Sequence, residues 1–194
     1  MNLIDQIKEY IPYNEQEKND KEMMIHFLLN NADAFDRKNT LAHMTASCFI
    51  VNKSLDKVLF CFHNIYQSYS WLGGHADNDK DLLSVAYKEA KEESGLQNIK
   101  AYDGNILSLE TLCVNGHIKK GKYVSSHIHF NITYLFIADE NEELHINEEE
   151  NSSLKWFTFS DCLKASKEEW FVKNIYPKLI EKVNKIKEEM KNEK

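Results

Sequence analysis

The spacing of hydrophobic residues changes along the chain and predicts which segments form helices and which form strands. Residues 1–40 carry apolar side chains at intervals of three and four, which is typical of helices that bury one face. Pro12 and Asn14 separate two such runs, so we expect two helices divided near these residues. From about residue 43 the pattern changes to β-rich runs at 45–52 and 57–64, with turn-forming residues between them. These runs predict a hairpin.

Two later segments have helical patterns. Residues 81–94 are helix-forming throughout, and Gly95 follows them as a residue that favours the left-handed conformation at helix ends. Residues 160–190 also show helical spacing, with a break expected near Pro177 because proline lacks the backbone N–H that a helix needs.

Further strands are expected at 99–115, 126–139 and 153–159, with a charged loop at 139–151. Strict alternation at 126–139 places a fully apolar face opposite a polar one, and we expect the apolar face to be the buried one. Strands and helices mixed in this order indicate a layered α/β or α+β fold. No internal repeat or low-complexity linker divides the chain.

The charge balance limits the classes of partner. Lys and Arg total 24 against 31 Asp and Glu, which gives a formal net charge of −7. With no basic surplus to neutralise phosphates, we do not expect duplex nucleic acid to be a partner. An acidic protein that acts on an anionic substrate needs a local cation to offset the repulsion, which directs attention to clusters of carboxylates.

Cysteine spacing and hydropathy indicate the cellular compartment. The cysteines lie far apart and form no CxxC pair, as is usual in a reducing compartment. No apolar stretch reaches the roughly 18 residues of a membrane span, and the N-terminal segment lacks a signal-peptide pattern. We therefore expect a soluble cytoplasmic protein without membrane association.

Three glutamates share one face of the helix predicted at 81–94. At about 100° per residue, Glu92 and Glu93 fall on either side of Glu89, and the apolar residues of the helix lie on the same side. A solvated surface is the ordinary interpretation of three glutamates, but carboxylates that face a core repel one another and lose hydration unless a cation is present. Oxygen ligands suit Mg²⁺ or Mn²⁺, which can polarise a phosphoryl oxygen and activate water.

The same segment resembles the Nudix box, a long pattern of glycines and glutamates at fixed intervals. The matching residues keep every spacing of that pattern: Gly74, Glu89, Ala90, Glu92, Glu93, Gly95 and Leu96. The resemblance extends to the hairpin before the box, to Trp71 ahead of the glycines and to the strand that contains Trp156, and covers about residues 43–165.

This resemblance implies a fold and an activity. The expected fold is α/β, a Nudix-type α/β/α sandwich with a mixed sheet, in which residues 1–40 form a helical N-terminal extension and residues 41–194 the Nudix hydrolase domain with its C-terminal helix. The expected activity is metal-dependent pyrophosphatase cleavage of a diphosphate linkage in a nucleoside diphosphate linked to another moiety, a small-molecule substrate. Glu89, Glu92 and Glu93 would hold Mg²⁺ or Mn²⁺, and Glu92 and Glu93 would be catalytic.

Two positions depart from the box. Lys80 stands where the family has glutamate, and Lys88 stands where it has arginine. The usual pair braces the loop against the helix, whereas two lysines repel. We expect a neighbouring acid, Asp79 or Asp81, to pair with Lys88 instead.

Polar residues outside the box are candidates for substrate contact. His127, His129 and Asn131 share the polar face of the strand at 126–139, and His75 directly follows the two glycines. The two histidines of the strand are also candidate ligands of Zn²⁺, but no third soft ligand lies near them in sequence.

The acidic run at 140–150 is a solvated loop by default. The resemblance implies that a glutamate outside the box serves as a further metal ligand or as the general base. Glu148, Glu149 and Glu150 are the candidates, with little to separate them, and we name Glu149 as the catalytic one.

Two other functions remain open. One is an enzyme on the same fold similar to isopentenyl-diphosphate isomerases, which use an active-site cysteine for which Cys61 and Cys113 are candidates. The other is a non-catalytic nucleotide-sensing Nudix module, which the lysine at position 80 favours. The apolar face of the last helix is expected to pack on the domain, with a homodimer contact as the alternative.

Overall fold

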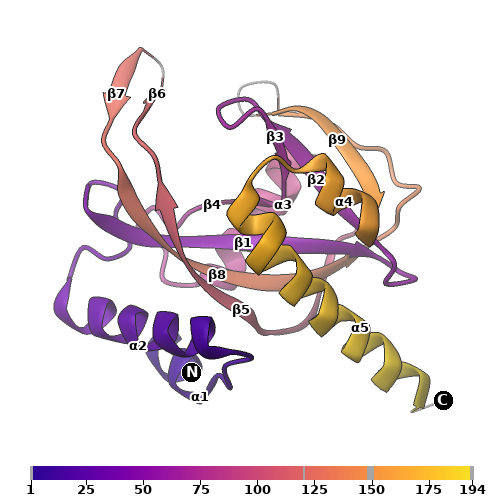
Figure 1. Cartoon of the computed structure of the whole chain (residues 1–194), viewed down its shortest axis with the longest axis horizontal. Helices are drawn as coiled ribbons and strands as arrows, with labels where there is room; N and C mark the ends of the chain where they lie inside the picture. The colour runs from indigo at the N-terminus through magenta and orange to yellow at the C-terminus, as the bar shows by residue number, and fades with distance from the viewer. Residues whose placement is uncertain (1, 120, 148–150, 193–194) are drawn as a thin grey trace.

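The computed structural model describes residues 2–119, 121–147 and 151–192, and Figure 1 shows its helices and strands. The helices are α1 (Leu3–Glu9), α2 (Glu15–Asn30), α3 (Leu82–Ser94), α4 (Phe159–Ala165) and α5 (Tyr176–Asn192). The strands are β1 (Ala42–Asn52), β2 (Lys57–His63), β3 (Ser68–Ser70), β4 (Leu72–His75), β5 (Lys100–Val114), β6 (His117–Lys119), β7 (Lys122–Val124), β8 (His127–Ala138) and β9 (Asn151–Thr158).

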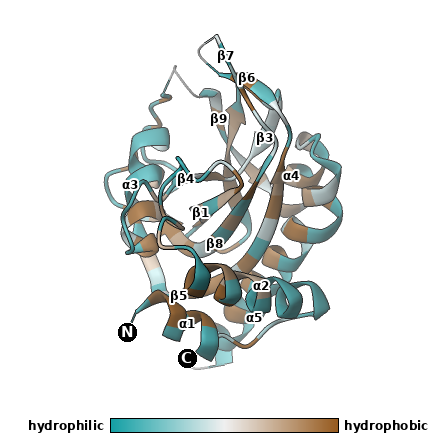
Figure 2. Cartoon of the chain, turned by 90° about the vertical axis from the view of Figure 1, so that its left-hand side faces the viewer, coloured by the Kyte–Doolittle hydropathy of each residue, from teal (hydrophilic) through white to brown (hydrophobic). Residues whose placement is uncertain are grey.

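The main sheet is mixed. Its strand order is β3-β2-β1-β8-β5, with β4 also paired to β1 and β9 also paired to β2. β1 and β8 run parallel, and the other pairs run antiparallel. Figure 2 shows α3 on one side of the sheet and α4 and α5 on the other. The predicted α/β fold, with a mixed sheet between helices and helices at the N-terminus, is confirmed.

Two apolar cores lie on the two sides of the sheet. On one side, Met44 and Ile50 of β1 pack in a cluster with Leu82 and Ala86 of α3 and with residues of α1 and α2. On the other side, Phe49 and Val51 of β1 belong to a cluster with residues of α5. β1 therefore buries both of its faces. No helix in the described part of the chain is long and apolar enough to cross a membrane.

The helix at the C-terminus differs from the expectation in one respect. The predicted break at Pro177 is wrong, because the helical run is interrupted after Ala165 and then continues through Pro177. A π-helical turn at Phe171–Ile175 precedes the proline, and the N–H of Tyr176 donates to the carbonyl of Phe171, five residues back. The widened turn accommodates a residue that cannot make the usual α-helical hydrogen bond.

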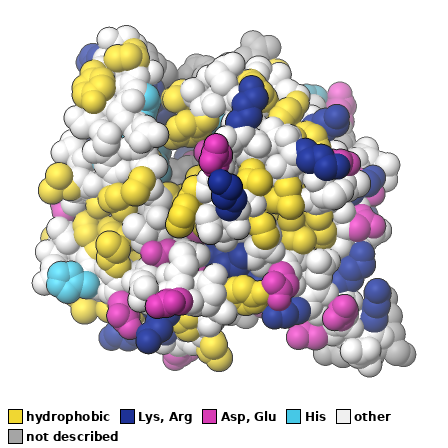
Figure 3. Space-filling view, viewed as in Figure 1, with side chains coloured by type: hydrophobic (Ala, Val, Ile, Leu, Met, Phe, Trp, Pro, Cys, Tyr) yellow, Lys and Arg dark blue, Asp and Glu magenta, His cyan; other side chains and the backbone are white. Residues whose placement is uncertain are grey.

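A short hairpin at 117–124 was not predicted. β6 and β7 form it, and it projects beyond the sheet as an arm that continues the β5–β8 pair (Figure 1). On the face in Figure 3, basic and acidic side chains are interspersed, and histidine side chains lie beside the hollow at the foot of this arm.

The polar face of β8 is buried as well as its apolar face, contrary to expectation. Asn131 is 1% exposed and Thr133 is 0% exposed. Both donate hydrogen bonds to the carboxylate of Glu110 in β5, and Asn131 also accepts from the hydroxyls of Thr45 and Ser47 in β1. Polar strand positions can be buried in this way only when every group finds a partner.

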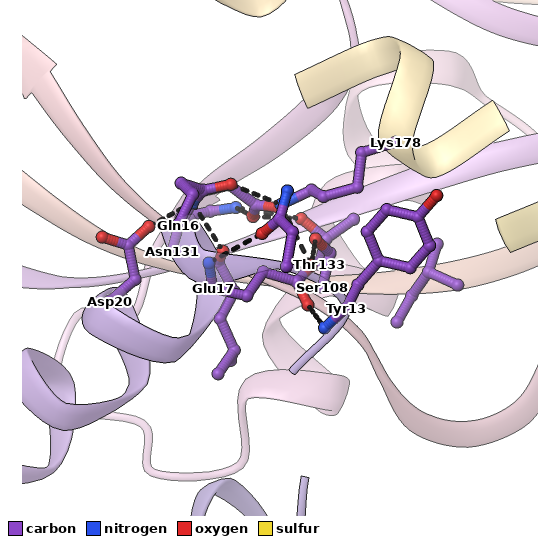
Figure 4. Close-up of polar contacts among 12 residues, drawn as sticks. Tyr13, Gln16, Glu17, Asp20, Ser108, Asn131, Thr133 and Lys178 are labelled. Carbon is purple, nitrogen blue, oxygen red and sulfur yellow. Dashed lines mark hydrogen bonds and ion pairs between the residues drawn. The ribbon is translucent and has the colours of Figure 1, made fainter. Parts of the chain in front are cut away.

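Buried charges complete this polar layer, and Figure 4 shows Glu17, Asn131 and Lys178 converging from α2, β8 and α5. The carboxylate of Glu17 lies 3.0 Å from Nζ of Lys178 and 2.6 Å from Nζ of Lys182. Nζ of Lys178 also lies 3.1 Å from Glu110. Burial alone raises the pKa of Glu17, but the two lysines outweigh it and lower the pKa to about 2.

The helix α2 also covers the free edge of the sheet. β5 is the last strand in the order, so one row of its backbone groups has no partner strand. Nε2 of Gln16 donates to the carbonyl of Leu109 at 3.3 Å, and the carboxylate of Asp20 accepts from the N–H of Thr111 at 3.0 Å. Side chains of α2 therefore take the place of a further strand.

We predict that Glu17→Gln destabilises the protein by about 3–5 kcal/mol, because it removes the carboxylate that pairs with Lys182 and leaves Lys178 with Glu110 alone. Urea unfolding at neutral pH measures this, with Glu22→Gln on the exposed side of α2 as the matched control, expected to change the free energy by less than about 0.5 kcal/mol.

The pH dependence follows from the lowered pKa of Glu17. Its stabilisation is present above the ordinary value of 4.5 and is lost as the pH falls toward about 2. The difference between wild type and Glu17→Gln should therefore shrink over this range. Equal unfolding free energies at pH 7 would contradict the assignment of these ion pairs.

Candidate active site

The box begins in β4, which is held by β1. Antiparallel pairing places Gly73 opposite Ser47 and Gly74 opposite Ala46. An added Cβ at Gly73 would lie 2.5 Å from the carbonyl oxygen of Ala46 and 2.7 Å from Cα of Ser47. The absence of a side chain at Gly73 therefore permits the two backbones to approach each other.

The helix α3 starts and ends as its sequence predicts. Asp81 is the N-cap, and its side chain accepts a hydrogen bond from the N–H of Ser84. Gly95 ends the helix with φ 74°, a left-handed conformation that favours glycine. Between them Leu82, Val85 and Ala86 are buried against the sheet, which fixes the rotation of the helix and thereby the direction of its glutamates.

Two of the three box glutamates face inward. Glu93 is 3% exposed, and its Oε2 accepts a hydrogen bond of 2.9 Å from the N–H of Gly73. Glu89 is half-buried, with its carboxylate against Gly74. The expectation of an inward carboxylate is wrong for Glu92, which is exposed and lies 3.8 Å from Nζ of Lys88.

Gly74 leaves room for the Glu89 carboxylate. A Cβ at position 74 would lie 2.4 Å from Cδ of Glu89 and within 2.7 Å of both carboxylate oxygens. The glycine pair of the box therefore has two different functions. Gly73 allows the backbone of β1 to approach closely, and Gly74 leaves space for the carboxylate of Glu89.

The expected pairing of Lys88 with Asp79 or Asp81 is wrong. Asp81 caps α3, and Asp79 accepts from the N–H of Asp81 at 2.9 Å, so both aspartates serve the helix start. Lys88 pairs with Glu92 one turn along the helix. Lys80 is exposed.

The loop of the box has a different brace, from outside the box. Arg37 binds the carboxylate of Asp77 through its Nε and one terminal nitrogen, a two-pronged ion pair. The guanidinium lowers the pKa of Asp77. The two residues are 40 positions apart, and the pairing of an acid in the loop with the only arginine of the chain is the one sequence signal that points to this contact.

The structure brings three of the four predicted substrate-contact residues together. His75, His127 and His129 lie around His43, with ring centroids 4.8–5.1 Å from the ring of His43. Asn131 is separate from them in function, because its side chain is committed to the buried layer described above.

His43 was not a predicted site residue. It lies at the start of β1, and parallel pairing places it beside His129. Nothing in the sequence near position 43 specifies that register.

Other candidates fall outside the site or outside the described residues. Glu149, the predicted general base, lies in the segment 148–150 and is outside the described residues. Cys61 is fully buried in β2, whereas Cys113 is exposed on β5. Burial leaves Cys61 no access to a substrate in solution.

A pocket of about 530 Å³ lies away from the box. It is formed by the connection between α1 and α2, by β5 and by α5, and its lining includes Tyr10, Tyr13, Tyr102 and Lys182. None of its lining residues belongs to the segment from Gly73 to Leu96. Its position gives it no part in the chemistry of the α3 carboxylates.

Two of the three box glutamates offer the kind of donor that a hard divalent cation prefers, although the three do not come together as a set of ligands in the described residues. Glu89 and Glu93 present oxygens next to the Gly73–Gly74 backbone, and Glu92, between them in sequence, has an exposed side chain. Oxygen donors of this kind suit Mg²⁺ or Mn²⁺. Gly74 provides the space that these donors occupy.

Comparison with known proteins identifies the family of the chain. The NUDIX domain model matches residues 41–179, more than half of the chain, and the chain belongs to this family. A crystal structure of an Ap4A hydrolase binary complex from C. elegans is similar, with 18% identity, a TM-score of 0.53 and coverage of 74% of this chain and 96% of that chain.

A NUDIX-family hydrolase from Clostridium perfringens is 27% identical, with a TM-score of 0.49 and coverage of 71% of this chain and 95% of that one. A search of the curated proteins finds no match.

We predict that alanine destabilises the protein more at Gly73 than at Gly74. Gly73→Ala should destabilise the protein by about 1–3 kcal/mol, because its Cβ meets backbone atoms that cannot move independently. Gly74→Ala should cost less than about 1 kcal/mol, because the Glu89 carboxylate can rotate away. Thermal and urea unfolding of both variants measure the difference, and equal losses would contradict it.

We predict that Asp81 acts as a cap and not as the partner of Lys88. Asp81→Ala should cost about 1 kcal/mol of stability, by the same amount in wild type and in Lys88→Ala. The Lys88–Glu92 pair should show a coupling of no more than about 0.5 kcal/mol, since both side chains are exposed. Double-mutant cycles provide the test, and coupling between Asp81 and Lys88 above this level would restore the earlier interpretation.

Proposed function

We propose that the chain is a metal-dependent hydrolase that cleaves a diphosphate linkage in a nucleoside diphosphate linked to another moiety. The observation that carries the proposal is the placement of Glu89 and Glu93 against the Gly73–Gly74 segment, in a chain of the NUDIX family. Two carboxylates at the edge of a core have a physical reason to be there if they bind a cation.

Glu89, Glu92 and Glu93 would hold Mg²⁺ or Mn²⁺. When bound, such an ion neutralises charge on the diphosphate and lowers the pKa of a bound water. The chain supplies the positioning for this chemistry, and most of the rate gain in phosphoryl transfer comes from positioning and charge stabilisation.

Each protein group in the site has a separate contribution. The N–H of Gly73 holds one oxygen of Glu93 in place, and the buried position of that carboxylate limits its rotation. Glu92 pairs only with Lys88 at the surface, a contact weak enough for a bound cation to replace. Arg37 fixes the loop through Asp77 and so replaces the brace that Lys80 cannot form.

The general base stays a prediction, with Glu149 as the candidate. The other acids of the same run whose contacts are described serve the fold. Glu140 pairs with Lys57, and Glu142 accepts from the backbone N–H groups of Gln97 and Asn98. The candidates that remain in this run include Glu148, Glu149 and Glu150, which all lie outside the described residues.

The substrate proposed is a small molecule. The similar fold of an Ap4A hydrolase makes dinucleoside polyphosphates one member of the panel to test, together with nucleotide sugars and nucleoside triphosphates. The formal net charge of −7 favours a reaction in which a cation accompanies the substrate.

We predict that Glu93→Gln lowers kcat at least about 100-fold with Mg²⁺ or Mn²⁺, because it removes a ligand charge at constant volume. The amide oxygen can still accept from the N–H of Gly73, so the melting temperature should change little. Phosphate release from the panel is the measurement, and Glu188→Gln at an exposed position of α5 is the matched control.

Two results would contradict the proposal. Wild type that releases no product from any substrate of the panel with either metal removes the catalytic assignment. Full activity of Glu93→Gln would show that α3 does not hold the reactive cation.

A further inference from the structure

Four histidines from three strands meet at one place in the fold. His43 comes from β1, His75 from β4, and His127 and His129 from β8. Their rings contact one another, with centroid distances of 4.8 Å between His43 and His129 and 5.0 Å between His75 and His129. Half of the chain's 8 histidines therefore lie in a single cluster.

One nitrogen of His43 is buried without a partner. His43 is 3% exposed, and its Nδ1 lies 3.0 Å from the carbonyl oxygen of Asn39. Because a carbonyl can only accept, Nδ1 carries the hydrogen, and Nε2 of the neutral ring has a free lone pair. Among the described residues, no group donates a hydrogen bond to this buried Nε2. A buried acceptor without a donor costs about 1–3 kcal/mol unless something else binds it.

His127 has the same arrangement. Its Nδ1 lies 2.8 Å from the carbonyl oxygen of Ser125, so its Nε2 also has the lone pair. Nε2 of His129 lies 3.0 Å from it and donates. A ring whose N–H is fixed by a backbone carbonyl is the usual preparation of a metal-binding histidine, since it fixes both tautomer and orientation.

Metal binding requires neutral imidazoles, and burial favours the neutral form of His43, His75 and His129. Burial and then the nearby cations and histidines lower the pKa of His75 to about 3 and that of His129 to about 2, and burial also lowers the pKa of His43. The neighbouring guanidinium of Arg37 is paired with Asp77, which offsets its repulsion toward a bound cation.

We propose that His43, His75 and His129 bind a late first-row divalent metal ion such as Zn²⁺, with the fourth position available to His127 or water. The ligand atoms of the three lie within 4.8 Å of one another, the only set of three or more His, Cys, Asp or Glu in the described ranges to do so. Ligands about 2.0–2.1 Å from a tetrahedral zinc are about 3.3 Å apart, so small side-chain rotations close the site.

The proposed site differs in chemistry from the α3 carboxylates. Imidazole nitrogens select Zn²⁺, Cu²⁺ or Ni²⁺ over Mg²⁺, whereas the glutamates offer only oxygens. The two sites are joined by the short segment from Gly74 to His75. A metal ion at the histidines would tie β1, β4 and β8 together at the foot of the β6–β7 arm, without depending on the function proposed for α3.

The test is zinc binding by the full chain in the absence of substrate. After chelator treatment and dialysis against Zn²⁺, wild type should retain one equivalent, and Zn²⁺ at a hundredfold excess over Kd should raise Tm by about 5 °C or more. Co²⁺ in place of Zn²⁺ should give the visible absorption of a tetrahedral site. His75→Ala and His129→Ala should each weaken binding more than the roughly 10–100-fold typical of residues that only orient a ligand.

Two controls separate this site from others. His26→Ala, at an exposed histidine of α2, should bind zinc as wild type does. Glu93→Gln should also retain one equivalent, and loss of zinc in this variant would place the ion at α3 instead. Circular dichroism checks folding, and His129→Gln replaces an alanine variant that fails to fold. No retained zinc in wild type, or full retention in the histidine variants, overturns the proposal.

Discussion

β1 determines where the functional side chains of this protein meet, because it is hydrogen-bonded to three other strands. Parallel pairing with β8 sets His43 beside His129, and antiparallel pairing with β4 sets Gly74 opposite Ala46. A slip of one residue in either pairing would turn the side chains of that strand to the opposite face. The positions of the Glu89 and Glu93 carboxylates against β4 and of the histidine cluster therefore both depend on the register of β1.

On one face of the β1–β8 pair, the side chains change from apolar to polar along the strands. Phe49 and Leu135 pack in the apolar core beside α5, the next pairs are hydroxyls and amides, and the last pair is two imidazoles. The polar pairs in the middle are satisfied by Glu110 of β5, whose charge is in turn paired with Lys178 of α5. A single strand pair thus carries packing, an ionic layer and potential ligands in succession.

Local signals explain what the sequence predicts well. The helix at 81–94 has its cap, its apolar side and its terminal glycine within one short segment, so the inward direction of Glu89 and Glu93 could be predicted, although that of Glu92 was not. The burial of Asn131 could not be predicted from the sequence, because it depends on charges contributed from α2 and α5. The same holds for the Arg37–Asp77 pair and for the proximity of His43 to His129, since each is decided by packing and register between distant segments.

The covering of β5 by α2 has a consequence for self-association. An uncovered strand of this length, β5 at Lys100–Val114, would offer its free backbone groups to the same strand of another molecule. Gln16 and Asp20 bind two of those groups, the carbonyl of Leu109 and the N–H of Thr111, with side chains. At these positions α2 leaves the edge of β5 no free backbone partner for a strand of a second molecule, a protection that is separate from the chemistry at α3.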